Sequence, residues 1–258
     1  DLMPVWDWNL LPGVTVFPGA AAAARLPWVG GVSNGMSGAA VMDYQLTDEK
    51  GGSLTAKKAW FCHNERVICL MAGLTQRNIV GPLQTAIDQC RWVSNVTVDG
   101  DQELTDEGEY TFENVRWLYH AGIGYVFLQP SSVSVRMKKI TGNWSDINAS
   151  IKLPPVREKV FTPVLQHKQH TVNTGYVVTM ATTPAAVATI SRKPDWTILR
   201  NDTLCQAVQW KDGTQMFVFH TKGSAEIQNK KKITVDKPCM LLITKDSIYG
   251  SNPAGKEE

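Results

Sequence analysis

The stretch that most constrains the fold is residues 56–74, which read AKKAWFCHNERVICLMAGL. Two short apolar runs, 57–62 and 67–72, flank a polar tip at 63–66. Short apolar runs broken by turn-prone polar residues favour a β-hairpin over a helix. The sequence therefore predicts a hairpin of two adjacent antiparallel strands.

The register of this hairpin predicts how its two faces are covered. With the two central tip residues as the loop, Cys62 lies opposite Val67 and Trp60 lies opposite Cys69. One face then carries Ala59, Phe61, Ile68 and Leu70, and the other carries Trp60, Cys62, Val67, Cys69 and Met71. A strand pair with one solvated face would alternate apolar and polar residues. We therefore expect both faces to be covered, with Trp60 and Phe61 buried on opposite sides of a layered β protein.

Composition narrows the class of protein. A chain of 258 residues with nine Trp and 43% hydrophobic residues can bury a sizeable core. A net charge of +2 is too balanced for a nucleic-acid binder that works by neutralising phosphates. No apolar run reaches the roughly 18 residues of a membrane span, and the start does not read as a signal peptide. We expect a globular chain with neither nucleic acid nor membrane as partner.

Strand-like runs bounded by turn residues follow one another along the chain, with almost no helical periodicity. Asp212-Gly213 is a strong hairpin turn, and Pro184 marks a break between a region of long strands and one of shorter strands. The expected strands cover 38–44, one long strand over 82–98, a hairpin over 115–129 with its turn at 121–124, then 132–140, 160–166, 176–181, 204–210, 216–221, 233–235 and 239–244. This pattern is typical of β-sandwich layers, with a domain boundary in 184–190.

Three local patterns have both a chemical and a structural interpretation. The Gly-rich stretch 30–35 lacks the following amphipathic helix that a phosphate-binding loop requires. The acidic stretch 99–109 does not complete a calcium loop and is interpreted as a solvated loop. His120, between Tyr119 and Tyr125, suggests an acid/base pair, but aromatic packing across a hairpin explains it equally simply.

The five cysteines show neither a CxxC pair nor metal-ligand spacing. Cys62 and Cys69 are diagonal neighbours in the predicted hairpin, about 7–8 Å apart at Cα, which is beyond comfortable disulfide reach. We expect buried free thiols, without a metal or another cofactor.

Seven segments, taken in order, resemble one known family. They are MPVWDWNLLPGVT, WVGGVSNGMSGAAVMDY, AKKAWFCHNERVICLMAGL, TAIDQC, WLYHAGIGYVF, TGNWSDIN and LCQAV…PCMLLIT. Together they are similar to the β-sandwich portion of polysaccharide lyase family 8, the chondroitin, hyaluronate and xanthan lyases. The resemblance covers nearly the whole chain. It implies an all-β fold: a large antiparallel β-sandwich (supersandwich) over 1–187, followed by a smaller antiparallel β-sandwich domain over 188–258.

The resemblance also implies an activity and its setting. Such lyases are bacterial, secreted or periplasmic, and cleave uronic-acid polysaccharides by β-elimination. Their catalytic Asn, His, Tyr and Arg come from an N-terminal α/α toroid that nothing in this sequence matches, so no catalytic residue is assigned here. Relatives usually have Asn at the place of Asp1, preceded by an acidic residue, and tend to continue beyond the last residues. The resemblance thus predicts a fragment truncated at both ends.

In this family the central sheet domain forms one wall of the substrate cleft. The resemblance therefore points to Asp1, Arg25, Trp28 and Asn34 as substrate-binding candidates for an acidic polysaccharide. Trp stacks on sugar rings, Asn bonds their hydroxyls and Arg pairs with carboxylate or sulfate. A core Trp28 and a purely structural Asn34 turn remain the alternative. At the level of the whole chain, the alternatives are a freestanding carbohydrate-binding β-sandwich and a sheet-built hydrolase with paired carboxylates, for which no convincing pair is present.

Overall fold

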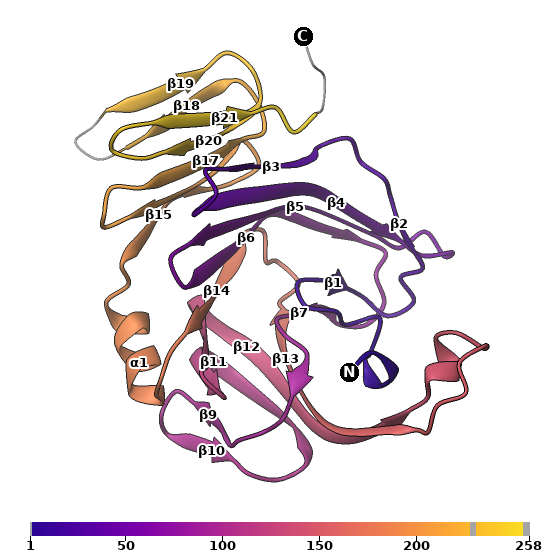
Figure 1. The fold of residues 1–258 in the computed structure, drawn as a ribbon. Coiled ribbons are helices and arrows are strands. Elements are labelled where there is room, and N and C mark those ends of the chain that lie inside the picture. The colour runs from indigo at the N-terminus through magenta and orange to yellow at the C-terminus, as the bar shows by residue number, and fades with distance from the viewer. Residues whose placement is uncertain (1, 228–230, 255–258) are drawn as a thin grey trace.

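The protein is an all-β molecule of one large and two small antiparallel sheets. The structure is a computed structural model that describes residues 2–227 and 231–254. The large sheet contains β1 (Thr15–Val16), β2 (Ala22–Ala23), β3 (Val29–Ser33), β4 (Gly38–Thr47), β5 (Ser53–His63), β6 (Arg66–Arg77), β7 (Leu83–Ala86), β8 (Cys90–Arg91), β9 (Val96–Val98), β10 (Gln102–Leu104), β11 (Gly108–His120), β12 (Ile123–Gly142), β13 (Val156–His167) and β14 (Thr174–Met180). Figure 1 shows that this sheet bends round on itself, so that its two ends form separate layers.

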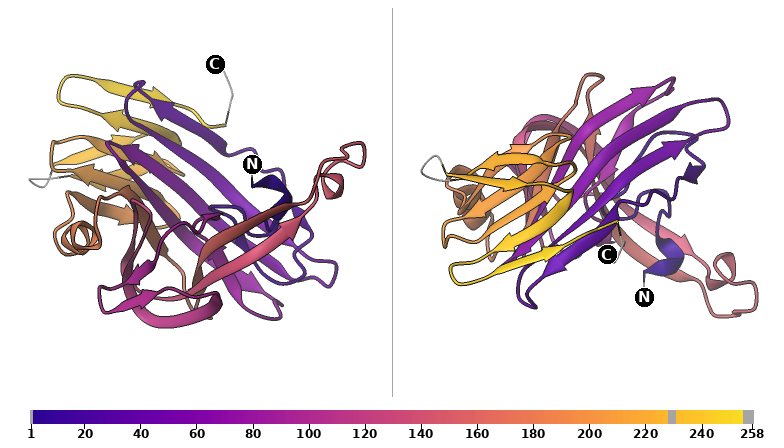
Figure 2. Two further views of the ribbon diagram at one scale, coloured as in Figure 1. Left: turned by 60° about the horizontal axis from the view of Figure 1, so that its bottom comes forward. Right: turned by 90° about the horizontal axis from the view of Figure 1, so that it is seen from above.

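The smaller sheets follow in the last quarter of the chain. They contain β15 (Trp196–Asn201), β16 (Cys205–Trp210), β17 (Gln215–Phe219), β20 (Cys239–Ile243) and β21 (Ile248–Ser251), and the separate pair β18 (Gly223–Glu226) and β19 (Lys232–Val235). Strands β20 and β21 lie against β3, and β17 and β20 against β4, as the views in Figure 2 also show. The predicted fold class is therefore confirmed, with a large antiparallel sheet preceding a smaller one.

The central hairpin has the predicted register. Cys62 pairs with Val67 and Trp60 with Cys69 across β5 and β6, and Asn64 takes the left-handed conformation at the turn, with a φ of 52°. Phe61 and its face pack against the C-terminal sheet in one core cluster, whereas Cys69 and its face pack against β11–β13 in another. Both faces are covered because the sheet bends over one of them and the C-terminal strands cover the other.

The burial of this hairpin differs from the expectation at two residues. Phe61 is fully buried, but Trp60 is only partly buried, and Cys62 is exposed. The reason is position: Cys62 lies at the hairpin end, beyond the layer that covers Cys69. All five cysteines are free thiols as expected, although burial holds only for Cys69 and Cys205, with Cys90 and Cys239 half-buried.

Four other expectations were wrong in detail. The long strand over 82–98 is three short strands, because the chain leaves β13 after β8 and pairs with β11 through β9. The acidic loop 99–109 contains β10, and the strand expected over 132–140 is the outer part of one continuous β12. The turn at 121–124 is tighter, since only Ala121 and Gly122 lie between the strands, both with positive φ.

The break expected at Pro184 is a helix, α1 (Pro184–Arg192). Pro184 occupies the first turn, where its missing N–H is not needed, and the Thr183 hydroxyl accepts a hydrogen bond from the Ala186 N–H at 3.2 Å. The helix buries Val187 against the large sheet and contains the predicted domain boundary. Two short 3-10 turns, η1 (Met3–Val5) and η2 (Trp144–Asp146), complete the structure, and no helix among the described residues is long and apolar enough to cross a membrane.

Candidate functional site

Strand β3 and the loops at its two ends hold three of the four predicted substrate-binding residues. Arg25 and Trp28 precede the strand and Asn34 follows it, while Asp1 lies outside the described residues. A strand of this length separates the two ends by roughly 20 Å. The structure therefore does not gather Arg25, Trp28 and Asn34 around one sugar ring.

Arg25 and Trp28 have different surroundings. Arg25 is exposed, and no ion pair or hydrogen bond of its side chain is found within the described residues. The half-buried indole of Trp28 packs on the core cluster shared with the C-terminal sheet, and its ring lies 6.2 Å from that of His220. Its indole nitrogen is buried and has no hydrogen-bond partner among the described residues. Trp28 thus packs at the junction between the sheets, and whether it also contacts a sugar stays a prediction.

Asn34 organises the turn between β3 and β4. Its side-chain oxygen accepts hydrogen bonds from the N–H groups of Met36 and Ser37, at 3.0 and 2.8 Å. The left-handed residue of this turn is Gly35, with a φ of 87°, and not Asn34. The Asn34 oxygen is therefore committed to the turn, and a shallow hollow of about 450 Å³ beside the turn is lined by its neighbours, among them Ser33, Gly35 and Met36, but not by Asn34.

Next to this turn lies a serine–histidine–aspartate relay that the sequence did not reveal. The Ser37 hydroxyl lies 2.7 Å from Nδ1 of His63, and Nε2 of His63 lies 2.8 Å from an oxygen of Asp212. The imidazole packs on Trp210, with ring centroids 4.9 Å apart. Asp212 was recognised only as a turn residue, and its partner is 149 positions away in the chain.

The relay connects two sheets and lacks the donors that acyl transfer requires. A serine nucleophile needs free N–H groups beside it to hold an oxyanion. In this turn the N–H of Gly35 bonds the Ser33 hydroxyl, and those of Met36 and Ser37 bond Asn34. The relay therefore acts as a hydrogen-bonded bridge between β5 and the β16–β17 turn.

His120 and its neighbours pack as structural residues. The His120 ring is buried against Phe161, with centroids 4.5 Å apart, and its Nε2 accepts the N–H of Val93 at 3.3 Å. Burial lowers the pKa of His120, so the ring stays neutral. The Tyr125 hydroxyl donates to Asp88 at 2.6 Å inside the core. His120 and Tyr125 pack on the ring of Phe161, so the aromatic interpretation holds, but the partner ring lies on the neighbouring strand β13 and not across the β11–β12 hairpin.

The segment at the start of the chain offers a second set of sugar-compatible side chains. Trp8 is 50% exposed and lies edge-on to Trp6. Asp7, Asn9 and Arg136 line a neighbouring hollow of about 360 Å³. An exposed indole beside amide and guanidinium donors suits a polar, acidic glycan. From the chain start the family resemblance named only Asp1 as a binding candidate, and not these residues.

A buried lysine fixes this segment on the sheet. Lys58 donates hydrogen bonds to the Gly13 carbonyl and, at 2.9 Å, to the Thr15 hydroxyl. Its ammonium lies 4.7 Å from the centre of the Tyr44 ring. Burial lowers the pKa of Lys58 to about 7, because the charged form is separated from water. The position of the chain start is therefore set by strand β5.

Two family models match this fold. The super-sandwich domain model of polysaccharide lyase family 8 matches residues 1–192, and the C-terminal β-sandwich domain model of the same family matches residues 197–253. The chain belongs to polysaccharide lyase family 8, as the resemblance predicted.

Particular relatives extend the match over the whole chain. The chain is 30% identical to the chondroitinase-AC of Pedobacter heparinus, covering all of this chain and 38% of that protein. It is 28% identical to a hyaluronate lyase of Thermasporomyces composti, over 93% of this chain and 32% of the relative. A chondroitinase AC lyase solved as oligosaccharide complexes superposes over the full chain with a TM-score of 0.84 at 27% identity, covering 40% of that structure. The chain thus spans less than half the length of these relatives.

Proposed function

We propose that this chain is the β-sandwich portion of a lyase that cleaves uronic-acid-containing glycans of the chondroitin or hyaluronan type by β-elimination. The observation that carries the proposal is the match of both family domains in order, together with relatives named for chondroitin and hyaluronate. In this proposal the protein acts outside the cytoplasm, secreted or in a periplasm, where such polymers are found.

The chemistry assigns the chain a supporting role. In β-elimination a Tyr or His base removes the proton at C5 of the uronate, a double bond forms between C4 and C5, and the sugar linked at C4 leaves, while an amide or a cation stabilises the charge that develops on the adjacent carboxylate. The titratable groups packed here are buried in the core or hydrogen-bonded across sheets, as with His120 and His63. We therefore place the catalytic groups in an N-terminal α/α toroid of the same protein and assign this chain one wall of the cleft.

The wall in this proposal consists of the chain start and the β3 region. Trp8 and Asn9 supply a stacking surface and hydrogen bonds near the chain start. Arg25 and the amide N–H₂ of Asn34 supply donors at the two ends of β3. Donors along a wall suit a polymer that carries one carboxylate on every uronate.

The test compares the full-length protein that contains this chain with the chain alone. Both are incubated with chondroitin sulfate and hyaluronan, and the unsaturated product is followed by its ultraviolet absorbance. We expect turnover from the full-length protein and none from the chain. Turnover by the chain that is lost in His120→Ala or His63→Ala would place the active site in the sheets and overturn the proposal. Glycan binding without turnover by the full-length protein would favour a carbohydrate-binding sandwich instead.

A further inference from the structure

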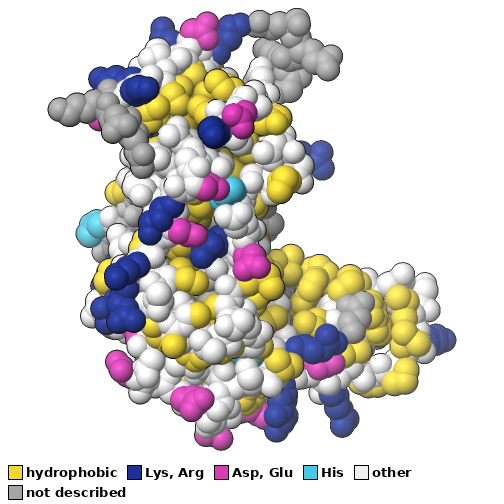
Figure 3. Space-filling model, turned by 60° about the vertical axis from the view of Figure 1, so that its left-hand side comes forward, with side chains coloured by type: hydrophobic (Ala, Val, Ile, Leu, Met, Phe, Trp, Pro, Cys, Tyr) yellow, Lys and Arg dark blue, Asp and Glu magenta, His cyan; other side chains and the backbone are white. Residues whose placement is uncertain are grey.

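A basic cleft lies where β8 runs beside the outer part of the β12–β13 hairpin. The cleft has a volume of about 430 Å³ and is lined by Arg91, Trp92, Val93, Lys139, Ile140, Thr141, Arg157, Glu158 and Lys159. Four of these side chains are cationic, and one is acidic. Figure 3 shows Lys and Arg side chains gathered along the lower arm of the molecule, where this hairpin projects.

The cationic side chains that line this cleft outnumber its acidic side chains. Arg91 is paired with Glu158 at 3.3 Å, and Lys139 is paired with Glu107. No ion pair of Arg157 or Lys159 is found among the described residues, and both side chains are exposed. Arg157 and Lys159 therefore have no direct ion-pair partner among the described residues, although the charge of Lys159 also acts on Glu107, and both can contact an anionic ligand.

The strand register places these cations on one face. Lys139 lies directly opposite Lys159, and Arg157 follows two residues along the same strand, opposite Thr141. Like charges directly opposite each other in a sheet are destabilising. Glu107 offsets part of this repulsion, because it pairs with Lys139 and also interacts with the charge of Lys159, while Arg157 adds a further cation to the same face. A bound anion would add to this compensation.

An aromatic surface completes the cleft. The ammonium of Lys159 lies 5.0 Å from the centre of the Trp92 ring, and the indole is half-buried beside it. The flat indole can stack on a sugar ring, while a guanidinium fork pairs with carboxylate or sulfate through two hydrogen bonds. The Thr141 hydroxyl adds a donor and acceptor for sugar hydroxyls.

We propose that this cleft is a binding subsite for an acidic glycan, with Arg157 and Lys159 on its carboxylate or sulfate groups and Trp92 against a sugar ring. The proposal rests on the proposed function, because the same acidic polymer is the ligand. A neutral glycan has no anionic group to contact Arg157 and Lys159, so it binds this cleft poorly.

The experiment measures binding of chondroitin sulfate oligosaccharides to the full-length protein by titration calorimetry, with dextran as the uncharged control. Arg157→Ala and the double variant Arg157→Ala/Lys159→Ala are compared with Lys138→Ala. Lys138 is the matched control, because it lies on the opposite face of the same hairpin and is already paired with Glu109 at 3.2 Å. We expect about tenfold to a hundredfold weaker binding for Arg157→Ala and a larger loss for the double variant, with Lys138→Ala near the parent.

Further variants separate the chemical roles. Arg157→Lys should recover part of the affinity, since it keeps the charge and loses the fork. The affinity of the parent should fall with added salt, and that of the double variant should fall less steeply. Trp92→Ala should weaken binding at every salt concentration, because stacking is not screened.

The remaining outcomes distinguish failure of the proposed subsite from failure of the proposed function. Unchanged affinity in the double variant, or an equal loss in Lys138→Ala, would overturn the subsite, while turnover by the full-length protein would leave the proposed function intact. A lower melting temperature with unchanged affinity would identify the cleft as a contact with another part of the protein, and would also overturn the subsite. Absence of both cleavage and acidic-glycan binding in the parent would refute the proposed function itself.

Discussion

Two hairpins of the same large sheet, β5–β6 and β12–β13, differ in what covers them. β5–β6 is packed on both faces, by the C-terminal sheet on one side and by β11–β13 on the other. In β12–β13 only the inner half is buried, with Val133, Val135 and Phe161 in the core. The outer half projects from the body (Figure 2), and its Lys138, Lys139, Arg157 and Lys159 side chains are exposed.

The difference shows that strand pairing and burial are separate properties of a sheet. β12 and β13 remain in register to Gly142 and Val156, beyond Met137 and Val160 where the continuous burial of the two strands ends, although Gly142 itself is buried beside Pro4. Backbone pairing therefore extends the sheet, while covering layers decide where apolar side chains gain stability. The covered hairpin contributes stability, and the uncovered one is free to display charge.

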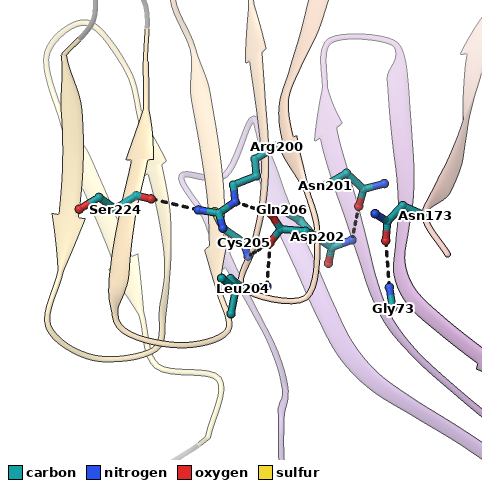
Figure 4. A network of polar contacts seen from close by, with 9 residues as sticks. All are labelled: Gly73, Asn173, Arg200, Asn201, Asp202, Leu204, Cys205, Gln206 and Ser224. Atoms are coloured by element: carbon teal, nitrogen blue, oxygen red, sulfur yellow. Dashed lines mark hydrogen bonds and ion pairs between the residues drawn. The ribbon is translucent and has the colours of Figure 1, made fainter.

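The junction with the C-terminal sheet shows how a covering layer is attached. The Asn201 amide donates to the Met71 and Thr174 carbonyls, both at 3.2 Å, and its oxygen accepts from Gln206 at 3.0 Å. Figure 4 shows part of this junction: the bond between Gln206 and Asn201, the ion pair of Arg200 with Asp202, and the bond from the Gly73 N–H on β6 to the Asn173 side chain. Polar contacts at the edge thus fix the position of an apolar interface.

The largest expected effect separates the two faces of the covered hairpin. Phe61→Ala should lower the free energy of unfolding by roughly 3–5 kcal/mol, because the ring is fully buried. Trp60→Ala should cost clearly less, since its ring is partly accessible. Chemical denaturation of both variants measures this. Equal losses would mean that the second face is as closely covered as the first.

Next in size is the bridge at the hairpin tip. His63→Ala removes hydrogen bonds to Ser37 and Asp212 and leaves the Trp210 ring uncovered, so we expect a loss of roughly 1–3 kcal/mol. His170→Ala, an exposed histidine, is the control. Calorimetry should show the C-terminal sheet melting earlier in His63→Ala. A single unshifted transition would contradict the bridge.

Acid should affect buried and exposed regions in different pH windows. Burial lowers the pKa of His167 to about 4 and that of His220 to about 3, below the ordinary value near 6.5. The unfolded chain then binds more protons, so stability is complete above pH 6.5 and falls below it, by up to about 1.4 kcal/mol per pH unit and histidine.

The ion pair between Glu109 and Lys138, at the exposed part of the sheet, provides the comparison with these buried histidines. A hydrogen bond from Lys138 lowers the pKa of Glu109, so this contribution is present above the ordinary carboxylate range and is lost only at lower pH. Unfolding followed from pH 7 to 4 should be less steep in His167→Gln and unchanged in Glu109→Gln. Equal slopes in parent and His167→Gln would show that His167 is not neutral in the fold.

A smaller effect tests the turn that holds Asn34. Asn34→Ala and Asn34→Gly both lose the oxygen that accepts two N–H groups, so each should cost roughly 0.5–2 kcal/mol. In the full-length enzyme, loss of kcat/KM beyond this change in stability supports a sugar contact by the amide. Full activity in Asn34→Gly would restrict Asn34 to its turn.

The smallest expected effect is on the uncovered hairpin. Arg157→Ala should change the free energy of unfolding by less than about 0.5 kcal/mol, because the side chain is exposed and unpaired among the described residues. Thermal melts of this variant beside Phe61→Ala measure the contrast directly. A loss comparable to Phe61→Ala would mean that the outer hairpin also stabilises the fold.

The sequence alone determined the features that depend on neighbouring residues. Alternation of apolar residues and the polar tip at 63–66 set the register of β5 and β6, and Asp212-Gly213 set the β16–β17 turn, where Gly213 has a φ of 93°. The alternation of side chains along a strand and the conformation of a turn depend on residues that are close in sequence, so they can be predicted from a single sequence. The order of family motifs likewise identified the family.

The tertiary structure alone decided what meets across long separations. Which layer covers Phe61, the contact of His63 with Asp212, and the cleft between Trp92 and Arg157 all depend on strands that are distant in sequence. Residues 82–98 read as one strand because apolar runs do not reveal where a chain changes partners. Local patterns carry no information on bending of the sheet, and that bending decides which polar side chains come together.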